Sequence, residues 1–260
     1  EMCIRDRHKL TNIIPFGFLK RDSKIQVDLK SLDHKDILCR EPEQDLLQYM
    51  LGASSLAIDV GANTGTYIKS ILETGASCLA VECNPSLCKV LQIRFAGNPK
   101  VKIKSLALSN SAGLAWLKIP KIGGHEQDGY SSIQLEFEEA EHVKRILVCK
   151  KRLDGIAPSR VTLVKIDVEG HELAVIEGAH HTLINDKPHL LIECENRHRD
   201  NAINSVKDLL ASYGYAGYFY HRKRLHSISR FHTSLQNPDA LADFGEKTRG
   251  EIDYVNNFLF

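Results

Sequence analysis

Short apolar runs alternate with amphipathic stretches along most of the chain. The apolar runs predict buried strands at 55–60, 77–83, 101–108, 161–168 and 189–195. The amphipathic stretches predict helices at 64–76, 85–97, 171–183 and 201–214. Strands alternating with helices of about a dozen residues favour a parallel sheet with both faces covered.

The middle and the end of the chain follow a different pattern. Short strands are predicted at 113–120, 131–137 and 145–153. The polar loop Gly123–Gly129 lies between the first two, and its length favours an active-site cover over the alternative, an unstructured excursion. A hairpin around Lys223 and a last strand are predicted at 217–229 and 254–260.

Composition narrows the classes of protein that the pattern allows. The formal net charge of +1 gives no electrostatic reason to expect a nucleic acid or an anionic membrane as partner. No apolar run approaches the roughly 20 residues of a membrane span, and no signal segment opens the chain. The cysteines lack the paired spacing of a zinc site, and Cys78, Cys149 and Cys194 lie inside apolar runs. We therefore expect a reduced, cytoplasmic setting and no bound metal.

The beginning of the chain is considered separately. Residues 1–7, EMCIRDR, resemble the translation of a transposon end used in preparing sequencing libraries, so they are treated as an artefact and excluded from reasoning about the fold. The length suits one large domain, because two would be cramped. We expect residues 8–50 to form an N-terminal extension that packs on the core and residues 51–260 to form a single domain.

The stretch IDVGANTGTY, residues 58–67, ends a strand with an acid and two glycines. A phosphate-binding GxxxxGK[ST] loop is excluded because no lysine follows Gly65, and a dinucleotide-binding GxGxxG turn because Asn63 replaces a glycine. Glu82 lies 23 residues after Asp59, where an acid accepts both hydroxyls of a ribose. A ribose without a phosphate suggests S-adenosylmethionine. The alternative is a glycine turn for helix packing with Glu82 in solvent.

Five motifs together resemble the FkbM-type methyltransferase family in order and spacing. They are IDVGANTGTY, AVECNPS, LALSNSAG, LVKIDVEGHELAVIEGA and LLIECENRH, and the resemblance covers about residues 40–260. The resemblance implies a doubly wound, Rossmann-like α/β fold of the class I methyltransferase type. Its sheet would be mostly parallel with an antiparallel C-terminal strand, and its cofactor would be S-adenosylmethionine.

The resemblance also implies which residues bind that cofactor. Glu82 would hold the ribose, and Asn84 would be a further contact. The remaining positions are Asp59, Gly61, Asn63, Gly65 and Tyr67 for the methionine half and Ala107, Leu108 and Ser109 around the adenine. One departure is Cys83, which stands where the family usually has proline. This changes the stiffness of the loop, and we do not expect it to abolish ribose binding.

Acidic pairs follow two neighbouring strands. Asp167 and Glu169 are two residues apart and share a face, as do Glu193 and Glu195 after the next strand. Both pairs fall at the carboxyl ends of strands, where ligands bind in such sheets. Glu172 suits the start of the following helix electrostatically.

Methyl transfer to a hydroxyl needs alignment, and a base that removes the proton accelerates it. The candidate catalytic residues are Asp167, Glu169 and His171, with His198 as a further candidate. Asp167 is preferred because it ends an apolar strand, where partial desolvation raises the pKa of a carboxylate toward a base's working range. Two alternatives stay open, namely transfer by alignment alone and a divalent metal held by Asp167, Glu193 and His198.

The resemblance implies O-methylation of a hydroxyl on a sugar, a glycan or a natural product, with a small-molecule or glycan acceptor. The alternatives are a cofactor-binding module without transfer activity and a methyltransferase acting on protein or nucleic acid. An intact turn and Glu82 oppose the first, and the missing (N/D)PP(Y/F) motif opposes the second. The basic run 221–230 is interpreted as a solvated hairpin tip, and Trp116 as a core residue rather than a sugar platform.

Overall fold

Eight strands form the larger of two sheets, in the order β11-β10-β12-β9-β8-β1-β2-β3. The computed structural model describes residues 27–137, 140, 142–243 and 247–260, so the segment 1–7 lies outside the described residues. The strands are β1 Leu56–Val60, β2 Ser77–Glu82, β3 Val101–Ser105, β8 Leu163–Ile166, β9 His189–Glu193, β10 Tyr218–His221, β11 Arg224–Ser227 and β12 Asn257–Leu259.

The direction of these strands confirms the expected fold class. β3, β2, β1, β8 and β9 are parallel neighbours, and β12 pairs antiparallel with both β9 and β10. β10 and β11 form the predicted hairpin, whose turn contains Arg222 and Lys223. Asp253 pairs with His221 and Arg222, so the basic run forms a hairpin tip that is partly neutralised. The chain therefore has the Rossmann-like, mostly parallel sheet with an antiparallel C-terminal strand.

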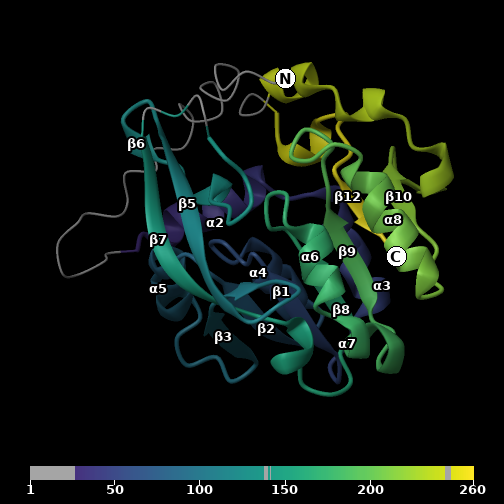
Figure 1. The fold of residues 1–260 in the computed structure, drawn as a ribbon, viewed down its shortest axis with the longest axis horizontal. Helices are drawn as coiled ribbons and strands as arrows, with labels where there is room; N and C mark the ends of the chain where they lie inside the picture. The colour runs from purple at the N-terminus through teal and green to yellow at the C-terminus, as the bar shows by residue number, and fades with distance from the viewer. Residues whose placement is uncertain (1–26, 138–139, 141, 244–246) are drawn as a thin grey trace.

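Helices cover both faces of the large sheet (Figure 1). Alternate residues of β1 face opposite layers: Ile58 and Val60 belong to one buried cluster, and Ala57 belongs to the other. The first layer contains α6 Glu172–Glu177, α7 His180–Asn185 and α8 Ala202–Ser212. The second layer contains α3 Leu47–Met50, α4 Thr66–Glu73 and α5 Pro85–Arg94. Burial on both faces explains why the parallel strands are nearly continuous apolar runs.

The helix predicted over 171–183 is two short helices. Gly178 ends α6, and a Cβ at this position would lie 2.2 Å from the carbonyl oxygen of Ser109. The Asp154 carboxylate accepts hydrogen bonds from the backbone N–H groups of His181 and Thr182, which stabilises the start of α7. The periodicity is unchanged across the break, so the sequence pattern alone did not show it.

A second sheet contains β4 Ala107–Leu108, β5 Gly113–Ile122, β6 His125–Glu126 and β7 His142–Lys151, in the order β4-β7-β5-β6. The single strand predicted at 101–108 is wrong, because β3 ends at Ser105 and β4 pairs with β7 instead. The strand predicted at 131–137 is reduced to one bridge between Lys118 and Ser132. In Figure 1, β5 and β7 form a long ribbon beside the large sheet.

The outer face of this ribbon corrects two expectations. Trp116 is 54% exposed, so the prediction of a core residue is wrong. The reason is the pleat of β5, which turns Leu117 and Ile119 inward and Trp116 outward. Cys149 is also exposed, since it pairs with the outward-facing Leu114.

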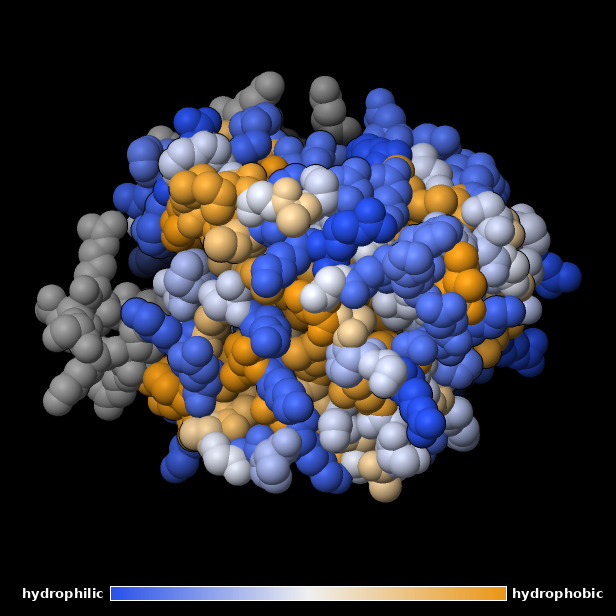
Figure 2. All heavy atoms as spheres, turned by 60° about the horizontal axis from the view of Figure 1, so that its bottom comes forward, coloured by the Kyte–Doolittle hydropathy of each residue, from blue (hydrophilic) through white to orange (hydrophobic). Residues whose placement is uncertain are grey.

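The molecular surface in Figure 2 carries apolar residues in patches that hydrophilic side chains interrupt. Within the described ranges, no helix has both the length and the apolar character needed to cross a bilayer.

Candidate functional site

Two adjoining cavities lie where β1, β2 and β8 end. The first, the ribose-side cleft, has a volume of about 590 Å³ including space open to solvent, and Glu82, Leu108 and Asp128 are among its lining residues. The second, the α2-side cavity, has about 610 Å³ counted in the same way. Gly61, Asn63 and Asp167 line both, so the two cavities share one wall. This is the edge of the sheet where ligands bind in doubly wound folds.

Neighbouring atoms of the protein leave no room for a side chain at either glycine of the turn. Gly61 has φ +81°, and a Cβ there would lie 1.7 Å from the carbonyl oxygen of Asp167. Gly65 has φ +91°, and its Cβ would lie 2.5 Å from the ring of Phe95. Gly61 lines both cavities, whereas Gly65 lines neither. Packing inside the protein therefore explains both glycines, with Gly65 against Phe95 at the end of α5 and Gly61 against the backbone of Asp167 after β8. Only Gly61 also lines the cavities.

Glu82 lies at the end of β2, in the wall of the ribose-side cleft, and is 5% exposed. Its two carboxylate oxygens accept hydrogen bonds from the backbone N–H groups of Asn63, at 2.9 Å, and Asn84, at 2.7 Å. Burial raises the pKa of Glu82, and the backbone N–H groups of Asn84, Asn63 and Cys83 oppose that effect. A carboxylate has about four acceptor positions, so roughly two remain for a ligand. The alternative of a solvated Glu82 is wrong, because this side chain is buried.

Asp59 and Asn63 each place a buried oxygen without a hydrogen-bond partner among the described residues. Asp59 is 2% exposed and lines the α2-side cavity. Burial raises the pKa of Asp59 to about 7; Lys165 lowers it, and Asp167 and Glu82 raise it further. Buried polar atoms normally have partners, so these two oxygens indicate where a ligand supplies the donors.

Asn84 lines neither cavity, and its side chain contacts other parts of the protein instead. Its fully buried side chain accepts a hydrogen bond from the N–H of Ser86 at the start of α5 and donates one to Asp128 at 2.7 Å. Asp128 does line the ribose-side cleft, and burial raises its pKa. The sequence interpretation missed Asp128; its only signal was the polar loop Gly123–Gly129 around it.

Two of the three predicted adenine-side residues line the ribose-side cleft. Ala107 and Leu108 line the ribose-side cleft together with Ile133. Cys83, which departs from the family pattern, lines the same cleft and packs against the cluster of Ala107 and Leu117. Ser109 lies just behind, hydrogen-bonded to His171.

Asp167 has a different environment from the one expected. Its side chain is 33% exposed, and one oxygen lies 3.1 Å from the Lys165 ammonium, which is 2% exposed. Lys165 also lies 4.8 Å from the centre of the Tyr67 ring. Burial alone lowers the pKa of Lys165, but the neighbouring carboxylates of Asp167, Glu193, Glu41 and Asp59 raise it overall. The ion pair therefore orients the carboxylate of Asp167, in the wall that the two cavities share.

Tyr67 and Glu41 extend this polar network. The Tyr67 hydroxyl donates a hydrogen bond of 2.6 Å to Glu41, and both residues line the α2-side cavity. Asn257 donates to the same carboxylate oxygen at 3.0 Å. The sequence interpretation assigned no role to Lys165, although it lies inside the motif LVKIDVEGHELAVIEGA, or to Glu41, which lies in none of the five motifs.

Glu169 and His171 both line the ribose-side cleft, and both have partners. Glu169 lies 3.2 Å from the Nε2 atom of His198. The Nδ1 atom of His171 faces the side-chain oxygen of Gln134 at 3.1 Å, and its Nε2 atom lies 3.0 Å from the Ser109 hydroxyl. With the Gln134 oxygen as acceptor, Nδ1 carries the proton and Nε2 accepts from Ser109. Burial and then Lys150 lower the pKa of His171, which favours the neutral ring.

The three residues of the metal alternative each have another partner. Asp167 pairs with Lys165, His198 with Glu169, and Glu193 accepts a hydrogen bond from Asn256 at 2.7 Å. In the part of the chain that the structure describes, no group of three His, Cys, Asp or Glu side chains is arranged to hold a metal ion.

The sheet order and the cavities at the carboxyl ends of its strands define a Rossmann-like α/β protein. The profile of the family described as "Methyltransferase FkbM domain" matches residues 59–216. The chain therefore belongs to the FkbM methyltransferase family, as the motifs predicted.

A solved structure shares the fold. A methyltransferase FkbM from Methylobacillus flagellatus KT has a TM-score of 0.52 and 13% identity, over 99% of this chain and 59% of that chain. An O-methyltransferase from Bacillus cereus in complex with SAH has a TM-score of 0.45 and 9% identity, over 98% and 89%. The chain thus spans about three fifths of the Methylobacillus protein's length. A search of curated protein sequences found no significant match.

Proposed function

We propose that this protein uses S-adenosylmethionine to methylate a hydroxyl group on a sugar, a glycan or a natural product. The observation that carries the proposal is Glu82, a buried carboxylate that two backbone N–H groups fix at the end of β2. An acid held in this way beside a cleft suits the two hydroxyls of a ribose. The turn beside it has no phosphate-binding pattern, which favours a nucleoside cofactor without phosphates.

The residues of the two cavities fit the parts of this cofactor. Glu82 would accept from the ribose hydroxyls, and the apolar side chains of Leu108 and Ile133 would flank the adenine. The partnerless oxygens of Asp59 and Asn63 would accept from the α-ammonium group of the amino-acid tail. When bound, the cofactor supplies a methyl group on a positively charged sulfur.

Asp167 is the proposed base of this reaction. It lies where the two cavities meet, and Lys165 fixes its orientation. Asp167 would accept the proton that the acceptor hydroxyl loses when its oxygen displaces the cofactor's sulfur from the methyl carbon. His171 is the rival base, although its Nε2 lone pair faces the Ser109 hydroxyl. Glu169 is a further candidate, with one carboxylate oxygen 3.2 Å from the Nε2 atom of His198.

The domain organisation and the cellular setting belong to the same proposal. Residues 51–260 would form the methyltransferase domain, with 8–50 as an extension packed on it. The six cysteines among the described residues are free thiols, which agrees with a reduced, cytoplasmic compartment.

The test is binding followed by transfer. The full chain is titrated calorimetrically with S-adenosylhomocysteine. It is then incubated with methyl-labelled S-adenosylmethionine and separate pools of saccharides, hydroxylated natural products, protein and RNA. We expect tight binding and transfer of label to a hydroxyl in one of the first two pools. Binding without transfer to any pool would indicate a binding module, label in protein or RNA would indicate a macromolecular substrate, and absence of binding would refute the proposal.

A further inference from the structure

Helix α2, Leu29–Leu38, lies ahead of the residues that match the family, yet it forms part of the proposed cofactor site. Lys35 and the following Cys39 and Glu41 line the α2-side cavity. The opposite side of this cavity comes from the glycine turn and from the ends of β1 and β8. A segment outside the family match therefore completes the wall.

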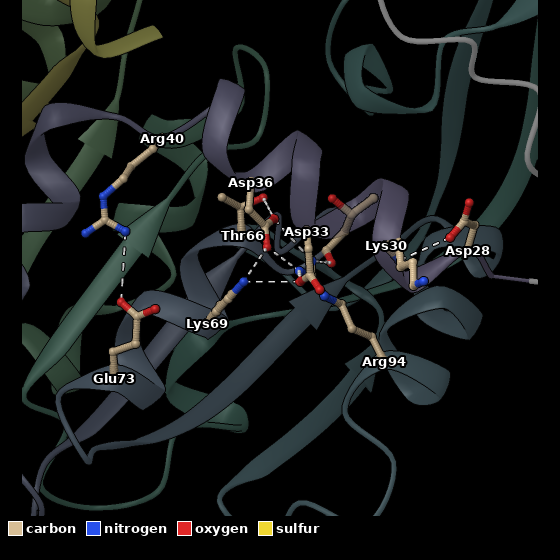
Figure 3. Close-up of polar contacts among 10 residues, drawn as sticks. Asp28, Lys30, Asp33, Asp36, Arg40, Thr66, Lys69, Glu73 and Arg94 are labelled. Atoms are coloured by element: carbon tan, nitrogen blue, oxygen red, sulfur yellow. Dashed lines mark hydrogen bonds and ion pairs between the residues drawn. The ribbon is translucent and has the colours of Figure 1, made fainter. Parts of the chain in front are cut away.

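A buried ion pair fixes α2 on the glycine turn. Asp36 of α2 pairs with Arg94 of α5, and the two side chains are only 8% and 6% exposed. The same guanidinium donates a hydrogen bond of 2.7 Å to the backbone oxygen of Thr64, in the turn itself. Asp36 also accepts from the Thr66 hydroxyl at 2.9 Å. Figure 3 shows these side chains converging between α2, α4 and α5.

Further contacts hold the segment in register. Lys69 of α4 lies 3.1 Å from Asp33 of α2. Downstream of α2, Gln44 donates a hydrogen bond of 2.7 Å to Ser70, and Leu47 is fully buried in the core cluster under α4. These anchors on both sides of Lys35 determine where its side chain meets the cavity.

The α2-side cavity has opposite charges on different parts of its wall. Asp59 and Asp167 bring negative charge from the ends of the strands, and Lys165 is already paired with Asp167. Glu41 adds a third acid, whose carboxylate accepts hydrogen bonds from Tyr67 and Asn257. Lys35 brings positive charge from α2. The ionisable groups that act on Lys35 most strongly are Cys39, Asp36, Arg94 and Asp128, and neither Asp167 nor Lys165 is among them. A zwitterionic α-amino acid group, with an ammonium and a carboxylate on one carbon, complements such a wall.

Two further features favour an anion near Lys35. Burial lowers the pKa of Lys35, and a negative charge placed beside its ammonium would oppose that effect. The eight-residue helix α4 starts at this cavity, and Gly65 gives its N-terminus no side-chain cap. Uncapped N–H groups at a helix start favour anions.

We propose that Lys35 binds the α-carboxylate of the cofactor's amino-acid tail, so that the extension ahead of the family match is part of the cofactor site. This inference rests on the proposed function. It assigns Lys35 a contact with the ligand, and it makes Asp36 and Arg94 positioning residues that hold Lys35 in place.

The test compares three probes on the full chain by calorimetry. S-adenosylhomocysteine has the whole tail, its decarboxylated analogue keeps the ammonium only, and 5′-methylthioadenosine has neither group. Lys35→Met should weaken S-adenosylhomocysteine about 10- to 100-fold, because a hydrogen bond between charged groups is lost. It should change the Kd of the other two probes by no more than about twofold. Lys35→Arg should keep most of the wild-type affinity for S-adenosylhomocysteine. Lys30→Met, at an exposed position on the same helix, is the matched control.

The outcomes separate this inference from the proposed function. If the wild-type protein binds none of the probes, the proposed function fails, and this inference fails with it. If the wild type binds S-adenosylhomocysteine and Lys35→Met binds it equally well, only the assignment of Lys35 is wrong. Equal loss for all three probes also overturns the assignment, because it would show a structural role for Lys35.

Discussion

Replacing Glu82 by glutamine tests the ribose contact directly, because the change keeps the shape and removes the charge. In the wild type, both carboxylate oxygens accept backbone N–H groups, from Asn63 and Asn84. A glutamine has one oxygen and one NH₂ group. Whichever way it turns, one of the two N–H groups faces another donor. We expect a loss of about 1–3 kcal/mol in the free energy of unfolding for that unsatisfied group.

The effect on cofactor affinity should be larger. The carboxylate has about two acceptor positions left for the ribose hydroxyls, and charge-assisted hydrogen bonds are roughly twice as strong as neutral ones. In Glu82→Gln one such bond is lost and the other weakened, which amounts to about 2–4 kcal/mol, or a 30- to 1000-fold rise in Kd.

Calorimetry with S-adenosylhomocysteine measures this rise, and thermal unfolding without ligand measures the change in stability. Glu172→Gln is a suitable control. Glu172 is 5% exposed and accepts the N–H of Gly170 at 2.8 Å, but it lines neither cavity. This control should lose stability and keep its affinity. A 2′,3′-dideoxy analogue should bind the wild type and Glu82→Gln equally. A folded Glu82→Gln protein with wild-type affinity would refute the ribose assignment.

Three further predictions follow from the geometry. Gly61→Ala should prevent folding or strongly lower the melting temperature, because its Cβ would lie 1.7 Å from a carbonyl oxygen. The control is Gly97→Ala, where no atom lies within 4 Å of the new Cβ, and it should lower the free energy of unfolding by only about 1 kcal/mol. Equal melting temperatures for the two variants would contradict this prediction. Asp167→Asn should lower turnover by about 10²-fold or more with little change in S-adenosylhomocysteine affinity; loss of transfer in His171→Ala alone would identify the histidine as the base. The pKa of Asp59 is about 7, and a bound ammonium favours its ionised form, so S-adenosylhomocysteine affinity should rise with pH from about 6 to 8 and binding should release a proton. Calorimetry in buffers of different ionisation enthalpy measures the proton release. Asp59→Asn should abolish both the pH dependence and the proton release.

Local pattern was sufficient to predict the large sheet and the glycine turn at the end of β1. The runs around Ile58 and Val164 are apolar on both faces, and in water such segments are stable only between two layers of helices. The same rule places Asp59, Glu82 and Asp167 together, because the carboxyl ends of parallel strands meet at one edge. For this reason the fold and the meeting of these three acids at one edge were predictable from the sequence, and the five motifs predicted the family.

Only the tertiary structure decided which of those residues face a ligand and which hold the protein together. The residues that Gly65 and Asn84 contact, Phe95 and Asp128, lie 30 and 44 positions further along the chain. The second sheet, the partner of Asp167 and the position of α2 depend equally on long-range contacts. Each of these results from packing and charge pairing between distant segments, and periodicity and spacing report only on residues that are neighbours along the chain.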